Sequence, residues 1–351
     1  MDYEDAIKMA DPPSTIKNVL YKKYIKPYLK REPVEDLYRY FLHQGYEAWR
    51  FSVKKEDINN MLFVEWMCEE LLKNGEEDLI VLIENVMVER FEIQKKLHQS
   101  EADYFNLKNS DPIDKRFSTA IRHYKVFYEN ELRLWATVPF YYVSKLGIKT
   151  RGSTPDTFIQ IAASDKLHTL KNVQTILAKG DVKELVKGFS NEIRNAGEGH
   201  DRYEITDNDT ILLHIVDPHT GKSKGSKQIE LTYSQLVQKI DECRKRIWIL
   251  RNGVYLFLNN NPVLGQKIKR TKPLSLREIK STLESFTDNR WLLLKEFDID
   301  KERKNLSLEV HYYKKKIGRS EELLFGNGER YDVVSIRKIV KYHDQILGVI
   351  Q

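Results

Sequence analysis

Apolar residues recur at helical spacing through most of the first 260 residues of this chain. The segment 115–147 shows the pattern most clearly, and one face of its predicted helix carries Phe117, Ile121, Tyr124, Phe127, Tyr128, Leu132 and Trp135. Similar patterns cover 57–98 and 232–258, and helices are also predicted over 181–200 and from Thr154, with Pro155 at the first helical position. Pro139 is expected to kink or end the helix over 115–147. Helices with such faces are stable when they bury them against one another. The sequence therefore predicts a mainly α fold built around a helical bundle.

Two β-like runs interrupt this helical pattern. "DTILLHIVD" and "KQIELTY", joined by the turn-forming stretch "PHTGKSKGS", predict a β-hairpin over 210–232 that is inserted between helices. After Pro262 we expect helices over 275–286 and 333–350 and strands over 290–300 and 305–316. We therefore expect a helical N-terminal region (1–110), a helical bundle with the inserted hairpin (115–260) and a small α+β module (262–351).

Composition excludes some classes of protein. The chain of 351 residues has 41% hydrophobic and 31% charged residues, a balance typical of globular domains, and no apolar run approaches the roughly 20 residues that span a membrane. Cys68 and Cys243 form no metal-binding pair by their spacing, and the polar N-terminus does not resemble a signal peptide. We expect a cytoplasmic protein without metal or cofactor. The net charge of +6 permits binding to an anionic polymer but does not require it.

The stretch "FSNEIRNAGEGHDRYEI" (189–205) combines residues that are suited to phosphate chemistry. Arg194 is followed by Asn195, and His200 comes after two glycines. Along an uninterrupted helix, six residues rotate by about 240°, so Arg194 and His200 would point apart. Glycines relax that constraint, and the helix can end near Ala196 so that His200 folds back toward Arg194. Alternatively, the glycines only cap the end of a helix and have no role in bringing His200 toward Arg194.

"FSNEIRNAGEGHD" resembles the signature of the HEPN superfamily, whose catalytic members carry an Arg, commonly followed by Asn, and a His four to six residues later. The resemblance extends to the helical layout of residues 115–260 and is greatest to bacterial abortive-infection-like members. It does not cover 1–110 or 262–351. Glu198 and the two glycines depart from the more common alanine-rich version of the motif. The resemblance implies an HEPN-like bundle and metal-independent cleavage of RNA.

The implied chemistry fits the residue types. RNA supplies its own nucleophile, the 2′-OH, and His200 can exchange protons near neutral pH. Arg194 can donate to phosphate oxygens, and Asn195 can orient His200, bind phosphate or hold the helix end. Candidate substrate-binding residues are Asp201, Arg202 and Tyr203, which follow the motif, and the acids Glu129 and Glu131 on the long helix, of which Glu131 is the chosen candidate. Each of these has a surface or supporting role as its alternative.

One Arg and one His are few for this reaction, and HEPN nucleases commonly bring two motifs together in a homodimer. We therefore expect a homodimer that acts on RNA as a toxin or antiphage effector, with an antitoxin or regulatory protein as an open question. Basic clusters at 244–246, 267–272 and 314–316 would attract RNA, or are solvated surface. The alternatives are a catalytically inert HEPN module that binds a partner or a nucleotide, and a helical adaptor with a chance motif.

Overall fold

The computed structural model describes the chain in segments. These are residues 14–152, 154–173, 177, 179–197, 203–206, 210–216, 223–262, 264, 292–300, 305–312, 322–324 and 330–332. The chain divides into two compact units. The first comprises Met1–Val86 and Lys96–Pro262, and the second comprises Met87–Lys95 and Val263–Gln351.

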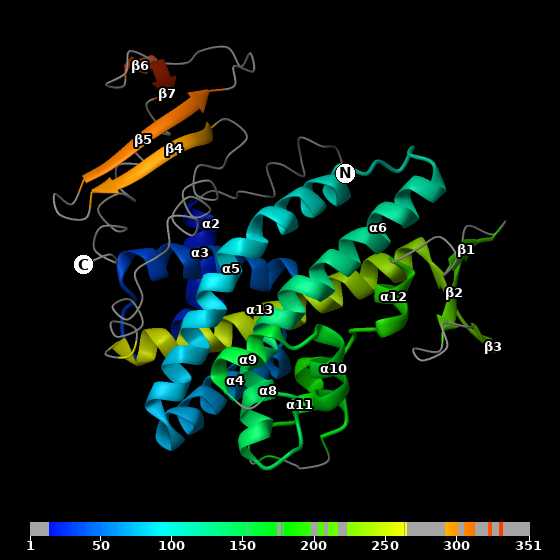
Figure 1. Cartoon of the computed structure of the whole chain (residues 1–351), viewed down its shortest axis with the longest axis horizontal. Helices are drawn as coiled ribbons and strands as arrows, with labels where there is room; N and C mark the ends of the chain where they lie inside the picture. The colour runs from blue at the N-terminus through cyan, green and yellow to red at the C-terminus, as the bar shows by residue number, and fades with distance from the viewer. Residues whose placement is uncertain are drawn as a thin grey trace. The chain divides into compact units, whose positions relative to one another are not determined.

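The described part of the chain is mainly α-helical, as predicted (Figure 1). The helices up to the candidate site are α2 (Ser14–Tyr24), the 3-10 helix η1 (Lys26–Tyr28), α3 (Glu35–Arg50), α4 (Lys55–Asn74), α5 (Glu76–Phe105), α6 (Ile113–Phe127), the π-helix η2 (Tyr128–Leu132), α7 (Arg133–Trp135), α8 (Thr137–Lys145), α9 (Pro155–Gln160) and α10 (Ala163–Lys171). They are followed by α11 (Val182–Leu185), α12 (Asn191–Ala196) and, after three strands, α13 (Tyr233–Asn260).

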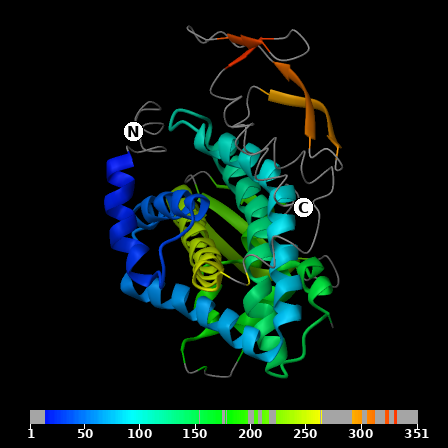
Figure 2. The same ribbon diagram turned by 90° about the vertical axis from the view of Figure 1, so that its left-hand side faces the viewer.

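Helix α13 forms the centre of the first unit. In its first half, buried residues such as Leu236, Ile240 and Cys243 recur at helical spacing and leave the opposite face exposed. In its second half nearly every residue from Ile247 to Phe257 is buried, which indicates that other elements surround the helix. It contacts α3, α4 and α6, and Figure 2 shows it in yellow between helices from the first and middle parts of the chain.

The predicted boundary near residue 110 does not separate two compact units, because the N-terminal helices pack directly on α13. Trp248 donates from Nε1 to the Gln44 carbonyl at 3.1 Å, and Asn252 donates from Nδ2 to Gln44 Oε1 at 3.1 Å. These bonds and the α4–α13 contact tie residues 14–74 to the predicted bundle. The predicted boundary at 262, in contrast, coincides with a division between the two units.

The predicted hairpin is part of a three-stranded antiparallel sheet. Strands β2 (Thr210–Val216) and β3 (Ser223–Thr232) pair as expected, and the unpredicted strand β1 (Tyr203–Ile205) pairs with the other side of β2. Ile211, Leu213 and Leu231 are buried. One face of this small sheet therefore belongs to the core of the first unit.

The long helix predicted over 115–147 is interrupted in two places. The π-helix η2 follows α6 directly, and Ala136 separates α7 from α8. Pro139 was expected to kink or end the helix. It lies instead in the first turn of α8, where a missing N–H leaves no helical hydrogen bond unmade.

The second unit contains two antiparallel strand pairs. Strand β4 (Leu292–Asp300) pairs with β5 (Asn305–Tyr312), and β6 (Glu322–Leu324) pairs with β7 (Arg330–Asp332). The strands predicted within 290–300 and 305–316 are thus present. The helices predicted around 275–286 and from residue 333 onward lie outside the described residues.

Candidate active site

The segment that carries Arg194 consists of two short helices instead of the single helix predicted over 181–200. Helix α11 ends at Leu185 and α12 begins at Asn191. Between them Gly188 has a φ of +91°, a left-handed conformation that residues with a Cβ rarely adopt and that cannot continue an α-helix. The prediction of one continuous helix was wrong, whereas the predicted helix end near Ala196 is confirmed.

The start of α12 is held by several hydrogen bonds around Ser190. The Ser190 Oγ caps the helix by accepting from the Ile193 N–H at 3.2 Å. The buried Tyr124 hydroxyl accepts from the Ser190 N–H at 2.7 Å and donates to the Ser190 carbonyl at 3.2 Å. Lys171 donates from Nζ to the neighbouring Phe189 carbonyl at 2.6 Å. Both α6 and α10 therefore fix the position from which α12 begins.

The end of α12 packs closely against α6. Gly197 has a φ of −72°, an ordinary helical value, so this glycine is not needed for an unusual backbone conformation. A Cβ at this position would come within 2.8 Å of Lys125 Cβ, which is closer than van der Waals contact allows. Close packing on α6, and not backbone freedom, therefore explains Gly197.

Arg194 is bound by an acidic side chain from the π-helix. Its Nε donates to Glu129 Oε1 at 3.0 Å, and its Nη2 lies 2.7 Å from the same oxygen. Its Nη1 donates to Asn195 Oδ1 at 2.9 Å. These contacts use three of the guanidinium N–H donors and fix the plane of the group. The side chain stays about one quarter exposed to solvent, at 26%.

The π-helix η2 directs successive side chains to different parts of the molecule. The Tyr128 hydroxyl donates to Asn191 Oδ1 at the start of α12, and Glu129 binds Arg194. Glu131, in contrast, is buried and accepts a hydrogen bond from Trp135 Nε1 at 2.9 Å. π-helical turns are frequent at functional sites because the extra residue re-aims side chains.

Of the predicted substrate-binding residues, Glu131 and Tyr203 lie among the described residues. The structure places Glu131, a predicted substrate-binding residue, in the core, and the acid at Arg194 is Glu129. Tyr203 lies in β1, where it pairs with Leu213, and burial raises the pKa of its half-buried hydroxyl. His200, Asp201 and Arg202 lie outside the described residues. Of the predicted Arg–His pair, the structure therefore describes the contacts of Arg194.

The basic cluster at 244–246 is bound to acidic residues of its own chain. Arg246 donates to Asp57 Oδ1 at 3.2 Å, and Lys245 Nζ lies 3.4 Å from Asp57 Oδ2. Arg244 is 6% exposed and lies 3.6 Å from Glu101. Lys245 and Arg246 are therefore paired with Asp57 inside the unit, whereas the carboxylate of Glu101 lies farther from Arg244. The clusters at 267–272 and 314–316 lie outside the described residues.

Arg244 also contacts a buried histidine. It donates from Nη2 to His123 Nε2 at 3.1 Å, and because arginine cannot accept, Nε2 must carry the lone pair. His123 Nδ1 then carries the proton and donates to Ser100 Oγ, at 2.9 Å. Burial, and secondarily the charge of Arg244, lower the pKa of His123 to about 3.

This shift predicts a loss of stability in mild acid. In the unfolded chain His123 takes up a proton near pH 6.5, whereas in the folded chain it does so only near pH 3. Between these pH values the unfolded state therefore binds more protons than the folded state. The free energy of unfolding should therefore fall as the pH drops through this window, by up to about 1.4 kcal/mol per pH unit from this residue. Urea unfolding of His123→Gln between pH 7 and pH 4 should give a flatter pH dependence than the wild type.

The exposed His43 provides the matched control, because its side chain is 48% accessible. His43→Gln should change the pH dependence less than His123→Gln does. Parallel curves for the wild type and His123→Gln would contradict the assignment of a neutral, buried imidazole.

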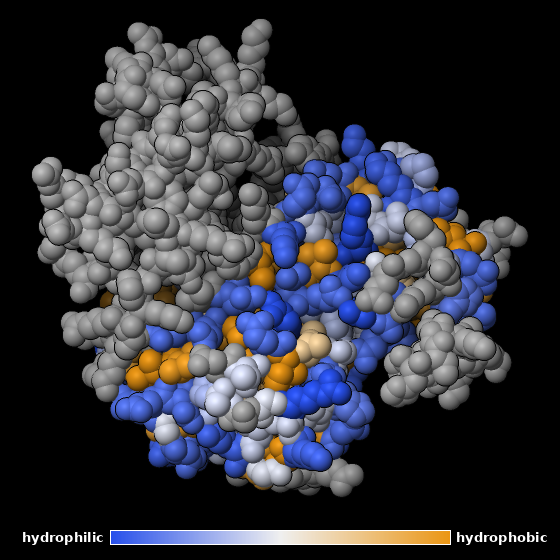
Figure 3. All heavy atoms as spheres, viewed as in Figure 1, coloured by the Kyte–Doolittle hydropathy of each residue, from blue (hydrophilic) through white to orange (hydrophobic). Residues whose placement is uncertain are grey.

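The surface of the described residues has no broad apolar area on the face drawn in Figure 3, where hydrophobic patches are scattered among hydrophilic ones.

Within the described segments no helix has both the length and the apolar character needed to cross a membrane. The same segments contain no group of three or more His, Cys, Asp or Glu side chains arranged to hold a metal ion.

Comparison of the chain with protein-family models, with curated proteins and with solved structures finds no match in any of the three. Function is therefore inferred from the residues and their geometry.

Proposed function

We propose that the chain is a metal-independent endoribonuclease of HEPN type, and that Arg194, Asn195 and His200 form its active site. The observation that carries the proposal is the placement of Arg194. Its guanidinium is oriented by Glu129 and Asn195 on a short helix whose start is held by Tyr124 and Lys171. A fixed, partly exposed guanidinium is suited to bind a phosphate oxygen with defined geometry.

In the proposed reaction the ribose 2′-OH attacks the adjacent phosphorus and the bond to the 5′-oxygen of the next nucleotide breaks. The products are a 2′,3′-cyclic phosphate and a 5′-OH. His200 exchanges the protons, which leave the 2′-OH and reach the 5′-oxygen. Arg194 stabilises the negative charge that develops on the phosphate oxygens. The Asn195 bond to Arg194 supports a role in orienting the guanidinium.

One motif supplies a single histidine, whereas the reaction needs both a base and an acid. We therefore propose a homodimer in which two motifs share one cleft. RNA is the proposed partner, and a toxin or antiphage effector in the cytoplasm is the proposed biological role. The bond between Arg194 and Glu129 also suits an inert HEPN-like module, because it neutralises the arginine within the chain. Cleavage of RNA distinguishes the two.

The test uses purified full-length protein and a labelled RNA. We expect fragments that end in a 2′,3′-cyclic phosphate, unchanged activity in EDTA, and no cleavage where a 2′-deoxynucleotide replaces the nucleotide whose 2′-OH attacks. Light scattering should give twice the chain mass. Expression in bacteria should be toxic for the wild type and harmless for His200→Ala. Intact RNA under all conditions, with a correctly folded dimer, would favour the inert module.

A further inference from the structure

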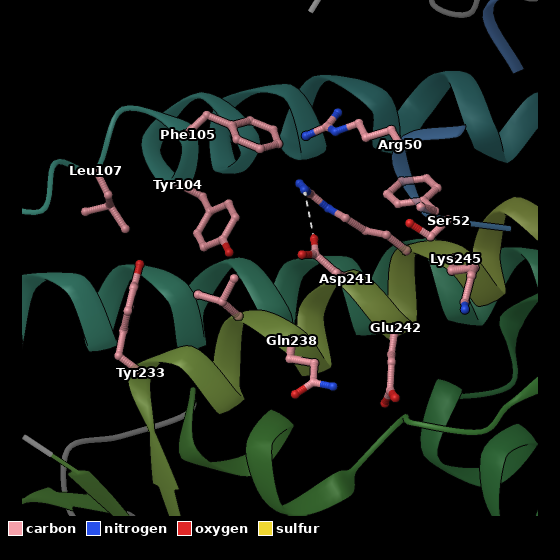
Figure 4. Close-up of a pocket in the computed structure, with 13 residues that line it drawn as sticks. Arg50, Ser52, Tyr104, Phe105, Leu107, Tyr233, Gln238, Asp241, Glu242 and Lys245 are labelled. Atoms are coloured by element: carbon pink, nitrogen blue, oxygen red, sulfur yellow. Dashed lines mark ion pairs between the residues drawn. The ribbon is translucent and has the colours of Figure 1, made fainter. Parts of the chain in front are cut away.

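A pocket of about 640 Å³ lies in the first unit, between the end of α5, the residues after α3 and the first half of α13. Arg194, Asn195 and Glu129 are not among its lining residues. Figure 4 shows Arg50, Tyr104, Phe105 and Asp241 converging on it, whereas Gln238 and Glu242 point away. The volume is in the range of small-molecule sites, roughly 300–1,000 Å³.

Two arginines lie against an exposed aromatic ring in this pocket. The Cζ atoms of Arg50 and Arg244 are 5.2 Å and 4.6 Å from the centre of the Phe105 ring. Phe105 is 48% exposed, so part of its ring is accessible to solvent. The pocket thus presents a partly exposed ring together with the two guanidinium groups that lie over it.

The two guanidinium groups are incompletely neutralised. Arg244 is almost fully buried, yet the carboxylates of Glu101 and Asp241 are 3.6 Å and 4.0 Å away, beyond hydrogen-bonding distance. The acceptor that it does reach is the neutral ring of His123. Arg50 has a carboxylate at 3.5 Å, that of Glu47. An anionic ligand that forms shorter hydrogen bonds with the buried Arg244 would therefore stabilise its charge.

We propose that this pocket binds a nucleobase-bearing phosphate, with the base stacked on Phe105 and the phosphate held by Arg50 and Arg244. Aromatic rings bind every base through its π-face, and guanidinium groups match the geometry of phosphate. Asp241 lies beside both arginines and competes with the phosphate. The ligand is either a free nucleotide or a nucleotide within an RNA strand. The proposal goes beyond the proposed function and does not depend on Arg194.

The test is calorimetric titration of the full chain carrying His200→Ala, so that cleavage cannot consume the ligand. The probes are AMP, ADP, a single-stranded RNA tetramer and inorganic phosphate. We expect Phe105→Ala and Arg50→Ala each to weaken nucleotide binding by about tenfold or more, which is the effect of losing one stacking or charged contact. Asp241→Asn should tighten it by several-fold. Arg151→Ala, at an exposed arginine paired with Asp165, is the matched control and should change nothing.

Tighter binding of AMP or ADP than of the tetramer identifies a free nucleotide as the ligand, and the reverse order identifies an RNA strand. Either result supports the proposal. Absence of binding by all nucleotide probes, or nucleotide affinities that Phe105→Ala leaves unchanged, would overturn it. Equal binding of inorganic phosphate and AMP would also overturn it, because the ring would then contribute nothing. None of these results bears on RNA cleavage at Arg194, which is measured separately.

Discussion

Replacing Arg194 by alanine is expected to lower the rate of RNA cleavage by about 10²–10³-fold, the usual effect of removing one group that stabilises transition-state charge. The reason is geometric. Glu129 and Asn195 hold the guanidinium at 2.7–3.0 Å, so that it is oriented before substrate arrives. Single-turnover cleavage of a labelled RNA measures the effect on the chemical step.

Two further variants separate charge from geometry at this position. Arg194→Lys keeps the charge but not the planar donor pattern, and should remain well below the wild type. Glu129→Gln should reduce activity less than Arg194→Ala, because it loosens the guanidinium without removing it. Arg151→Ala is the control for loss of a surface arginine. The Arg194–Glu129 pair is partly exposed and therefore contributes little to stability. The melting temperatures of these variants should thus stay near that of the wild type. Full activity of a folded Arg194→Ala protein would rule out the proposed site.

Replacing Asp57 by alanine is expected to lower the free energy of unfolding by about 3–5 kcal/mol, the range found when one partner of a buried ion pair is removed. Asp57 is 4% exposed. Its carboxylate accepts from the Lys54 N–H at 3.0 Å and from Arg246 at 3.2 Å, with Lys245 at 3.4 Å. The variant would leave two nearly buried cations without this counter-charge and would remove a bond at the start of α4.

The control for Asp57 is Asp165, whose bond to Arg151 is at least as short, at 2.8 Å, but exposed. Asp165→Ala should lower the free energy of unfolding by less than about 1 kcal/mol, because solvent-exposed ion pairs contribute little to stability. Chemical denaturation gives the free energy of unfolding of both variants. The comparison isolates the effect of burial, because both aspartates pair with basic side chains. Equal losses for the two variants would contradict a stabilising role for the buried Asp57 as the counter-charge of Lys245 and Arg246.

Helical periodicity was sufficient to predict much of the fold. The prediction over 232–258 matches α13 (Tyr233–Asn260), because its apolar residues and the stop before Pro262 are local signals. Local signals also predicted the hairpin and the start of α9 at Thr154, with Pro155 in its first position. Contacts between distant segments are not local. The packing of α3 and α4 on α13, which merges the first two predicted domains, was therefore not predicted.

The candidate site was predictable in its residues but not in its geometry. Arg194 and the end of its helix followed from the motif and the glycines. The break at Gly188 did not, because a single glycine in a helical pattern does not reveal its φ. The choice between Glu129 and Glu131 depends on the π-helix, in which one extra residue changes which side chains share a face. The sequence names both acids as candidates, and the π-helical turn decides that Glu129 contacts Arg194.

The wide turn at η2 has a consequence for how this chain can change. A π-helical turn holds one residue more than an α-helical turn. Loss of a single codon within 128–132 would convert the wide turn into a regular α-helical one. The side chains of the turn itself would be re-aimed, and we expect Glu129 to lose its contact with Arg194. A deletion of one residue could therefore silence the site in one step and leave the sequence of the motif intact.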